Sequence, residues 1–508
     1  MKPAHLLSLL RAHVSKVSIA SVTFLWIVAP TGAQTVEILA ADQISRDPNI
    51  TEAQRLIGHV KLGHQDAVLT CDSAWRFDDG KVEVFGEVVM RQPPATTMNA
   101  RYVVIQPGED WARAEGDVVM VHEGARLEAP SLSYLMKARR ARYRERARIQ
   151  DDGWTVTSRS GTYWAPEEVI ELGGNVLAIR DADTLRSDSL HWRRAEERYI
   201  FHGPTTWTSP EVGFSCRRGD VRMEERDPTG WLAGDVDVRD EDGTIVGDSL
   251  KWSDDVSEAW GEVVMRSADG TGEVHGAYAR RDAADSLEVV VGSQARRAWL
   301  RQIEDGDTLL LAARELTRSR EVLTATREVT MVQDEMVGVG DSLVWDEKAE
   351  TIRVWGAPEL WSAKDRMAGD SLTLFMNDQA PEKLELRGHA VVLAPANDTL
   401  AHRIQGRDLD AHFVDGELVT VDVVGNGEVV TFEVPEEGRE GKVRMNTAVC
   451  AKVTLEVADR KLTGIALKQS PRGTIKPVPQ GEDLRAFQVG EAPRFGPWET
   501  SQQDPLPE

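Results

Sequence analysis

The sequence has few cysteines, few aromatic residues and no recognisable metal-binding motif. Only three of its 508 residues are cysteine, and Phe, Trp and Tyr together make up 6%. Cys71, Cys216 and Cys450 are too few and too far apart for a disulfide framework, and whether two of them pair is left open. The chain has no CxxC motif and no two histidines at ligand spacing, so we expect no metal and no cofactor.

An excess of positive charge is also absent. Asp and Glu number 84 against 60 Lys and Arg, which gives a formal net charge of -24. Binding to nucleic acid requires a basic face, so nucleic acid is excluded as the main partner. The proportions of hydrophobic residues (41%) and charged residues (28%) are those of a folded protein.

Long hydrophobic runs are missing except at the N-terminus. There a basic start precedes an apolar run from Val17 to Ala29, and Thr31-Gly32-Ala33 is a small-residue cleavage site. This pattern predicts a signal peptide over residues 1–33, with an uncleaved anchor as the alternative. We therefore expect the mature protein to be soluble outside the cytoplasm.

The main positive feature is an internal repeat. GEVVM occurs at Gly86–Met90 and Gly261–Met265, GDVVM at Gly116–Met120, and REVTM at Arg327–Met331. Weaker copies fill the intervals, and the period is about 29 residues over almost the whole mature chain.

A second repeated segment is the tetrapeptide GDSL, at Gly247–Leu250, Gly340–Leu343 and Gly369–Leu372. GDSL is a signature of ester hydrolases, in which a single serine is the nucleophile and a histidine and an aspartate converge on it. Here the motif recurs with the period of the repeat, and no histidine recurs beside it. We therefore predict that Ser249, Ser342 and Ser371 are strand residues and that the protein is not an enzyme.

Apolar and polar residues alternate within these segments. In GEVVM, Val88 and Met90 share one face, and in GDSLKW, Leu250 and Trp252 do so. A period of two residues predicts β-strands. Turn signals separate the strands, at Asp79-Gly80, Asp242-Gly243, Asp269-Gly270 and Asp415-Gly416. The predicted fold is all-β: a long repetitive two-sheet jellyroll, solenoid-like, of about 13 hairpin units that each contain two short strands.

The glycine-acid-valine segments and the following Asp-Ser-Leu segments, behind a signal peptide, resemble the OstA-like family. That family includes LptA and the N-terminal domain of LptD, which act in lipopolysaccharide transport. The resemblance covers roughly Val36 to Val434. We expect a signal peptide at 1–33, an OstA-like repeat region at 34–435 in one or two stacked modules, and a final β unit with a Pro-rich tail at 436–508.

The resemblance implies a β-taco in the periplasm, whose apolar groove holds the acyl chains of lipid A. It also implies that the partners are lipopolysaccharide and other transport components with OstA-like or related jellyroll domains, joined by edge-strand pairing. The alternatives are a structural or adhesive secreted β-solenoid with a closed core and, less favoured, a secreted ester hydrolase.

Alternation places one set of apolar residues on the inner face. The predicted groove residues are Val88, Met90, Val118, Met120, Val176, Val263, Met265, Val329 and Met331. Closed core packing is the alternative role for them. Trp192, Trp252 and Trp345 have the same orientation and are interpreted as core or groove rim.

One basic segment, KARRARYRERAR at Lys137–Arg148, stands out in the acidic chain. Arg140, Arg142 and Arg144 are candidates for contact with an anionic headgroup, because arginine suits phosphate. A solvated outer strand face is the favoured alternative.

Overall fold

The computed structural model describes most of the chain, in two compact units, residues 1–254 and 255–508. The described residues are 35–46, 52–222, 229–253, 255–304, 306–333, 336–362, 365–377, 380–397, 399–414, 417–434, 442–458, 461–478, 484–493 and 495. The predicted signal peptide and the turn predicted at Asp415-Gly416 lie outside them. None of the helices in these residues is both long enough and apolar enough to span a membrane.

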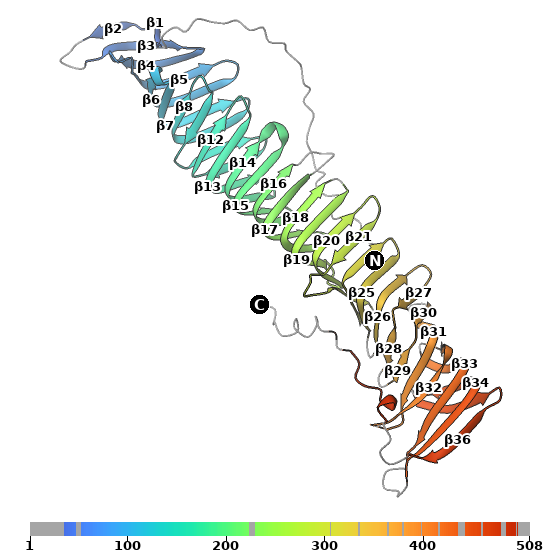
Figure 1. The fold of residues 1–508 in the computed structure, drawn as a ribbon. Helices are drawn as coiled ribbons and strands as arrows, with labels where there is room; N and C mark the ends of the chain where they lie inside the picture. Colours follow the sequence, from blue (N-terminus) through green and yellow to red (C-terminus); the bar gives the residue numbers. More distant parts are fainter. Residues whose placement is uncertain are drawn as a thin grey trace. The chain divides into compact units, whose positions relative to one another are not determined.

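Unit 1 consists of antiparallel strands that mostly pair with their neighbours in sequence (Figure 1). Its long strands are β3 (Gln54–His64), β4 (Ala67–Arg76), β5 (Val82–Gln92), β6 (Thr96–Gln106), β7 (Trp111–His122), β8 (Ala125–Leu135), β13 (Val169–Arg180), β14 (Asp183–Arg193), β15 (Arg198–Thr208), β16 (Val212–Arg222), β17 (Thr229–Asp240) and β18 (Gly243–Ser253). Its short elements are β1 (Glu37–Ala40), β2 (Gln43–Arg46), β9 (Arg140–Tyr143), β10 (Ala147–Asp151), β11 (Trp154–Ser158), β12 (Ser160–Trp164) and the 3-10 turns η1 (Pro107–Glu109) and η2 (Arg194–Glu196).

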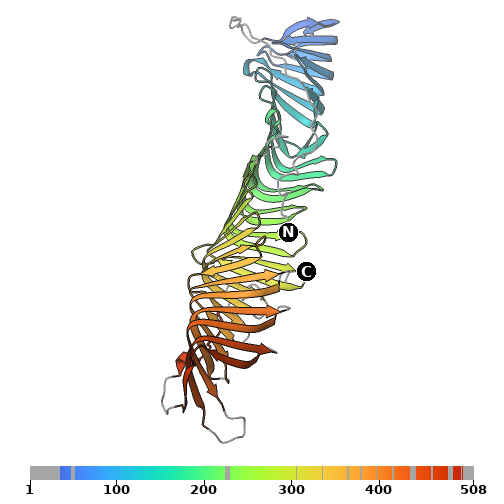
Figure 2. The ribbon, with the colours of Figure 1, turned by 90° about the vertical axis from the view of Figure 1, so that its right-hand side faces the viewer.

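Unit 2 is built in the same way, with several strands split in two. Its strands are β19 (Val256–Ser267), β20 (Gly272–Asp282), β21 (Leu287–Val291), β22 (Ala298–Glu304), β23 (Asp307–Ala313), β24 (Glu315–Ser319), β25 (Val322–Gln333), β26 (Met336–Asp346), β27 (Thr351–Trp355), β28 (Glu359–Ser362), β29 (Asp365–Ala368), β30 (Ser371–Asn377), β31 (Ala380–Pro395), β32 (Ala401–Val414), β33 (Glu417–Glu433), β34 (Arg444–Ala458), β35 (Lys461–Lys468) and β36 (Arg472–Pro477), followed by the 3-10 turn η3 (Arg485–Phe487). Figure 2 shows β31 to β34, in orange to red, as curved strands side by side.

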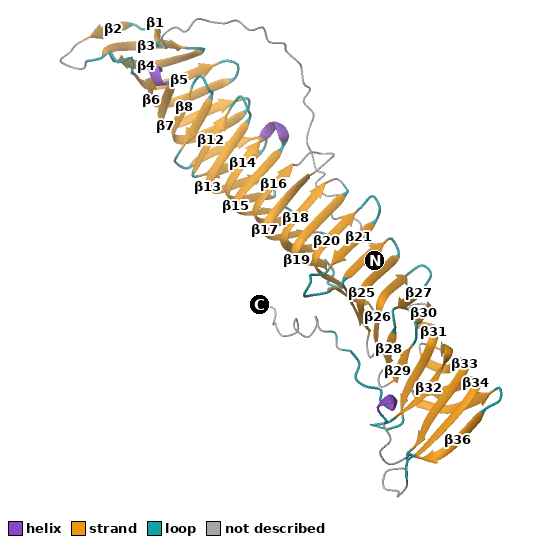
Figure 3. Ribbon diagram, in the orientation of Figure 1, coloured by secondary structure: helices purple, strands orange, loops and turns teal. Residues whose placement is uncertain are grey.

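The predicted all-β class is confirmed. The described residues contain strands and three short 3-10 turns, and Figure 3 shows strands throughout both units. The repeat differs from the prediction in one respect: a typical unit contains two long strands of 10 to 12 residues, such as β5 and β6, instead of two short ones. The pairings of the long strands pass through a bulge near the middle, as on β5 between Phe85 and Val88, and a bulge bends a strand without ending it.

The bulges fold the sheet of unit 1 into two layers. Across adjacent strands, Tyr134 pairs with Ala112, Ala112 pairs with Ile105, and Ile105 pairs with Val82, the first residue of β5. Tyr134 therefore belongs to the same end of the sheet as Val82. Yet the Tyr134 hydroxyl donates a hydrogen bond of 2.6 Å to Gln92, the last residue of β5. In a flat sheet these ends would lie roughly 30 Å apart at about 3.3 Å per residue. We call the layer of Val82–Phe85 wall A and that of Val88–Gln92 wall B; the turns at their free edges form rims A and B.

The repeated motifs meet at the bend. Gly86 has a φ of 95° and Gly388 a φ of 73°, both in the left-handed region. A Cβ at Gly86 would overlap the carboxylate of Asp72, and one at Gly388 that of Asp370. The aspartate of a D-S-L segment, or of the related D-S-A segment at Asp72, therefore occupies the space beside the glycine of the next bend. This packing explains why the two motifs repeat together.

The prediction for the motif serines is confirmed, because Ser249, Ser342 and Ser371 lie in β18, β26 and β30. His389 contacts Asp370, the aspartate of one GDSL copy, with 2.9 Å between Nδ1 and Oδ2. The imidazole of His389 is 90% exposed. The alternation is confirmed as well: Val88 and Met90 are buried while Glu87 is exposed.

Candidate functional site

The interior of unit 1 is filled with side chains. Its five predicted groove residues have an exposed fraction of at most 2%: Val88, Met90, Val118, Met120 and Val176. Leu56, Leu69 and Tyr134 are equally buried. The inward orientation of these residues is as predicted, and in this conformation their side chains form a closed core. Their contact with lipid remains a prediction.

Contacts between the two rims hold this interior shut. Gln92 also donates to the backbone carbonyl of Met136 on the opposite rim, at 3.2 Å. Arg139 on rim A forms an ion pair of 2.7 Å with Asp66 on rim B. We call such contacts cross-rim contacts.

A further cross-rim contact is the most buried ion pair among them. Arg194 Nε lies 2.6 Å from Asp151 Oδ2, and Arg194 Nη2 donates to Oδ1 at 3.0 Å. The side chains are 17% and 5% exposed. At this pair, the opposing rims of unit 1 are joined by charged groups that water hardly reaches.

The ionisation of these groups reflects that burial. Burial raises the pKa of the Tyr134 hydroxyl to about 12, so it remains a donor to Gln92. Burial also raises the pKa of Asp151, although Arg194 opposes the shift. For Asp66 burial acts in the same direction, but hydrogen bonds from Gln92 and Arg139 outweigh it and leave the pKa lowered.

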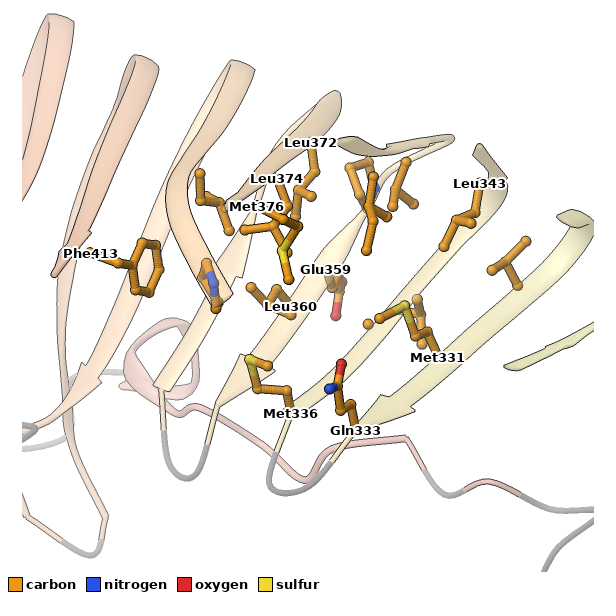
Figure 4. A pocket seen from close by; sticks show the side chains of 18 residues that line it. Met331, Gln333, Met336, Leu343, Glu359, Leu360, Leu372, Leu374, Met376 and Phe413 are labelled. Carbon is orange, nitrogen blue, oxygen red and sulfur yellow. The ribbon is translucent and has the colours of Figure 1, made fainter. Parts of the chain in front are cut away.

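Unit 2 has a cavity between its walls (Figure 4). It encloses about 880 Å³, part of which is open to solvent. In Figure 4, Leu374 and Met376 lie on one side of the space, and Leu360 and Met336 lie on the other. Two ion pairs near it stay within one wall: Arg366–Glu359 joins the paired strands β28 and β29, and Arg318–Glu347 joins β24 to the residue after β26.

The lining of this cavity is mostly hydrocarbon. Its 18 residues are Val329, Met331, Gln333, Met336, Gly338, Val339, Leu343, Ile352, Val354, Pro358, Glu359, Leu360, Leu372, Leu374, Met376, Pro381, Leu384 and Phe413. Gln333 and Glu359 supply its polar side chains. Three methionines give the cavity an adaptable surface, because methionine is unbranched and polarisable. The cavity is thus suited to apolar chains of variable shape.

Two of the four groove residues predicted for unit 2 line this cavity. Val329 is 3% exposed and Met331 is half-buried. Val263 is buried and Met265 half-buried, and neither is part of the cavity lining.

Sequence reasoning missed most of the lining. Leu360, Leu372 and Leu374 come from β28 and β30, where the strands are split and the repeated pentapeptide is lost. The methionines were the available signal, since Met331, Met336 and Met376 recur over a short stretch that also holds a GDSL copy.

The three candidate headgroup arginines lie in unit 1 and are not part of this cavity. Arg140 stacks over the Trp164 ring at 4.6 Å, and Arg142 and Arg144 are exposed. These positions are consistent with the outer strand face that was favoured for them, and headgroup contact by them remains a prediction.

The remaining candidate residues are structural. Trp192 and Trp252 are buried and Trp345 is half-buried. The thiols of Cys71, Cys216 and Cys450 are free and buried. Burial raises the pKa of Cys71 to about 12 and that of Cys216 to about 11, so both are unreactive. The described residues contain no cluster of His, Cys, Asp and Glu able to hold a metal ion.

Comparison with known proteins gives two findings. Residues 33–188 match the family model described as OstA-like protein. The crystal structure of LptH from Pseudomonas aeruginosa, the LptA-homologous periplasmic component of the conserved lipopolysaccharide transport device, shares 16% identity with this chain. The match covers 22% of this chain and 81% of LptH, with a TM-score of 0.20. The search of curated proteins found no match.

Proposed function

Because residues 33–188 belong to the OstA-like family, we propose that this chain is a non-catalytic protein of lipopolysaccharide transport whose unit 2 holds lipid acyl chains. The observation that carries the proposal is the apolar cavity between the walls of unit 2, whose lining includes Met331, Leu360 and Leu374. As the family resemblance implies, we place the protein in the periplasm.

The physical need for such a cavity is large. Exposing an acyl chain to water costs about 0.8 kcal/mol per methylene, so the free energy of exposing a lipid with several chains amounts to tens of kcal/mol. The apolar lining of the cavity can shield part of such a lipid, and holding the remainder would need the walls to separate further.

Unit 1 has a different role in this proposal. Its predicted groove residues, Val88 and Met90 among them, would face lipid only after the cross-rim contacts open. In the observed conformation the interior of unit 1 is a closed core, whereas unit 2 has a cavity lined by apolar side chains. Of the predicted groove residues, Val329 and Met331 line the cavity, and we propose that they contact lipid first; Val263 and Met265 would follow only after the walls separate.

We propose that the strand edges bind the partners. All six residues of β36 are exposed, and this strand pairs with β34. Ile475 in β36 is 60% exposed and Val449 in β34 is 52% exposed. An edge strand with free backbone groups and exposed apolar side chains suits the addition of a strand from another chain. The partners would be transport components with OstA-like or related jellyroll domains.

The test uses a photo-crosslinking amino acid inside and outside the cavity. Leu374 lines the cavity, and its neighbour Thr373 has the opposite orientation on the same strand. We expect lipopolysaccharide to crosslink to the probe at Leu374 and hardly at all to the probe at Thr373. Equal crosslinking at both positions, or none at Leu374 with the protein folded, would reject the lipid site.

A second candidate function is a structural β-solenoid with a closed core. The dry interior of unit 1 favours it, because Met90 and Val118 have no exposed surface. The crosslinking experiment separates the two functions, since a structural solenoid would give no lipid adduct at Leu374.

A further inference from the structure

A row of arginines packs against glycines at the bend of unit 1. Arg101 packs against Gly116, Arg159 against Gly174, and Arg217 against Gly234. The residue after the glycine then decides whether the arginine is neutralised.

In two of these three copies an aspartate follows the glycine. Asp117 forms an ion pair with Arg101, and Asp235 forms one with Arg217 at 2.5 Å. In the third copy the residue after Gly174 is Asn175, which carries no charge. Arg159 consequently forms no ion pair with any residue that the structure describes.

Two more arginines lie beside Arg159. Ala147 at the start of β10 pairs with Ser158 at the end of β11, so Arg146 and Arg159 are the next residues beyond this pair and lie beside each other. Arg186 is level with Leu177, which is in turn level with Thr157. Both arginines are exposed, and neither has an ion-pair partner within the described part of unit 1.

The sheet is interrupted at the same place. The other long strands of this unit run through the bend unbroken. Here, however, β9 and β10 are separated at Arg144–Arg146, and β11 and β12 are separated at Arg159. The hollow at this break encloses about 1680 Å³, largely open to solvent. It is lined by Arg146, Arg159, Arg186 and Arg217, with hydroxyl groups from Thr157, Thr206 and Ser215.

The charge balance of the hollow is positive. Asp235 neutralises Arg217, and Asp188 is the other acidic residue of the lining. Three arginines against one aspartate leave a formal charge of about +2, in a chain whose net charge is -24. An isolated exposed arginine is ordinarily solvated, but three that line one hollow beside hydroxyl groups suit a multiply charged anion.

We propose that this hollow binds a phosphate group, with Arg146, Arg159 and Arg186 as ligands. The guanidinium fork matches phosphate oxygens in a bidentate manner, and the threonine and serine hydroxyls can donate to the remaining oxygens. The phosphate could belong to a lipid headgroup or to a soluble phosphate compound. This inference does not rest on the lipid cavity of unit 2.

The test is calorimetric titration of the full chain with two probes at low salt. Inorganic pyrophosphate represents the soluble source, and vesicles of phosphatidylcholine with and without phosphatidic acid represent the headgroup. We expect saturable binding of at least one probe that weakens as salt rises. Binding of pyrophosphate indicates a soluble phosphate, and binding only to vesicles with phosphatidic acid indicates the headgroup.

The repeat itself provides matched variants. Asn175→Asp installs the acid that the other two copies have, so it should neutralise Arg159 and weaken binding by roughly tenfold to a hundredfold without removing any arginine. Arg159→Gln should do the same. Arg101→Gln, at the equivalent position that is already paired, should leave binding unchanged. Absence of binding to both probes, or equal effects of Arg159→Gln and Arg101→Gln, would overturn the site.

Discussion

The buried ion pair between Asp151 and Arg194 offers the sharpest test of how unit 1 is closed. Replacing Arg194 by methionine leaves the Asp151 carboxylate, whose side chain is 5% exposed, without its partner. Breaking a buried pair in this way costs about 3 to 5 kcal/mol, because an uncompensated charge remains inside. The variant should therefore open the rim beside β10 and β11.

The cost should disappear when both partners are removed. Asp151→Leu together with Arg194→Met replaces the pair by apolar groups, which is commonly neutral or stabilising. The loss in the single variant should also shrink at low pH. Burial raises the pKa of Asp151, and without Arg194 that pKa rises further, so the carboxyl becomes neutral as the pH falls.

Hydrogen-exchange mass spectrometry of peptides from β10, β11 and β14 measures this opening locally. A cost of about 3 to 5 kcal/mol corresponds to exchange that is on the order of a hundredfold to a few thousandfold faster, at 1.4 kcal/mol per tenfold. The control is Arg113→Met, which breaks the exposed pair between Arg113 and Glu115 and should cost less than about 1 kcal/mol.

The outcome that refutes this reasoning is specific. If Arg194→Met changes exchange by less than about threefold, or if the double variant exchanges as fast as the single one, the pair does not hold the rims together.

Three further predictions follow from the same structure. Tyr134→Phe leaves the buried amide oxygen of Gln92 without its donor, so unfolding in urea should show a loss of about 1 to 3 kcal/mol; no loss would mean that this cross-rim contact is dispensable. Burial raises the pKa of Asp365 to about 6 from 3.8, so the stabilising effect of its protonated form is complete below pH 3.8 and is lost as the pH rises through 6. Asp365→Asn should therefore add at most about 3 kcal/mol to the free energy of unfolding at pH 7 and flatten its dependence on pH between 4 and 7. An unchanged pH profile would contradict this. Gly86→Ala places a Cβ against Asp72 at a φ of 95°, and we expect a melting temperature lower by several degrees that Asp72→Ala in the same chain partly restores; a Gly86→Ala protein as stable as the parent would show that the bend tolerates side chains.

The sequence was sufficient to predict the fold class and the orientation of side chains. A period of two residues specifies which side chains share a face, so Val88 and Met90 were placed correctly on the inside. Recurrence of GDSL was enough to assign Ser249, Ser342 and Ser371 to strands, because a nucleophile is needed only once.

The closure of unit 1 could not be predicted in the same way. The contact between Tyr134 and Gln92 joins residues 42 positions apart on opposite walls. Local periodicity shows which residues point inward, but the distance between the walls depends on side-chain volumes and on such long-range contacts. A filled core and an open groove therefore give the same alternating pattern.

The cavity and the basic hollow were missed because each is a departure from the repeat. Leu360 and Leu374 belong to split strands in unit 2, and Asn175 replaces the aspartate found in equivalent copies of unit 1. A search for what recurs emphasises the regular positions, whereas the candidate sites lie where the repeat is interrupted.

The most direct test of the central claim is native mass spectrometry of the full chain purified without harsh detergent. If the interior of unit 2 carries acyl chains, the spectrum should contain a lipopolysaccharide adduct that Leu374→Asp removes while the protein remains folded by circular dichroism. A spectrum of bare protein, together with no binding of added lipopolysaccharide, would contradict the account.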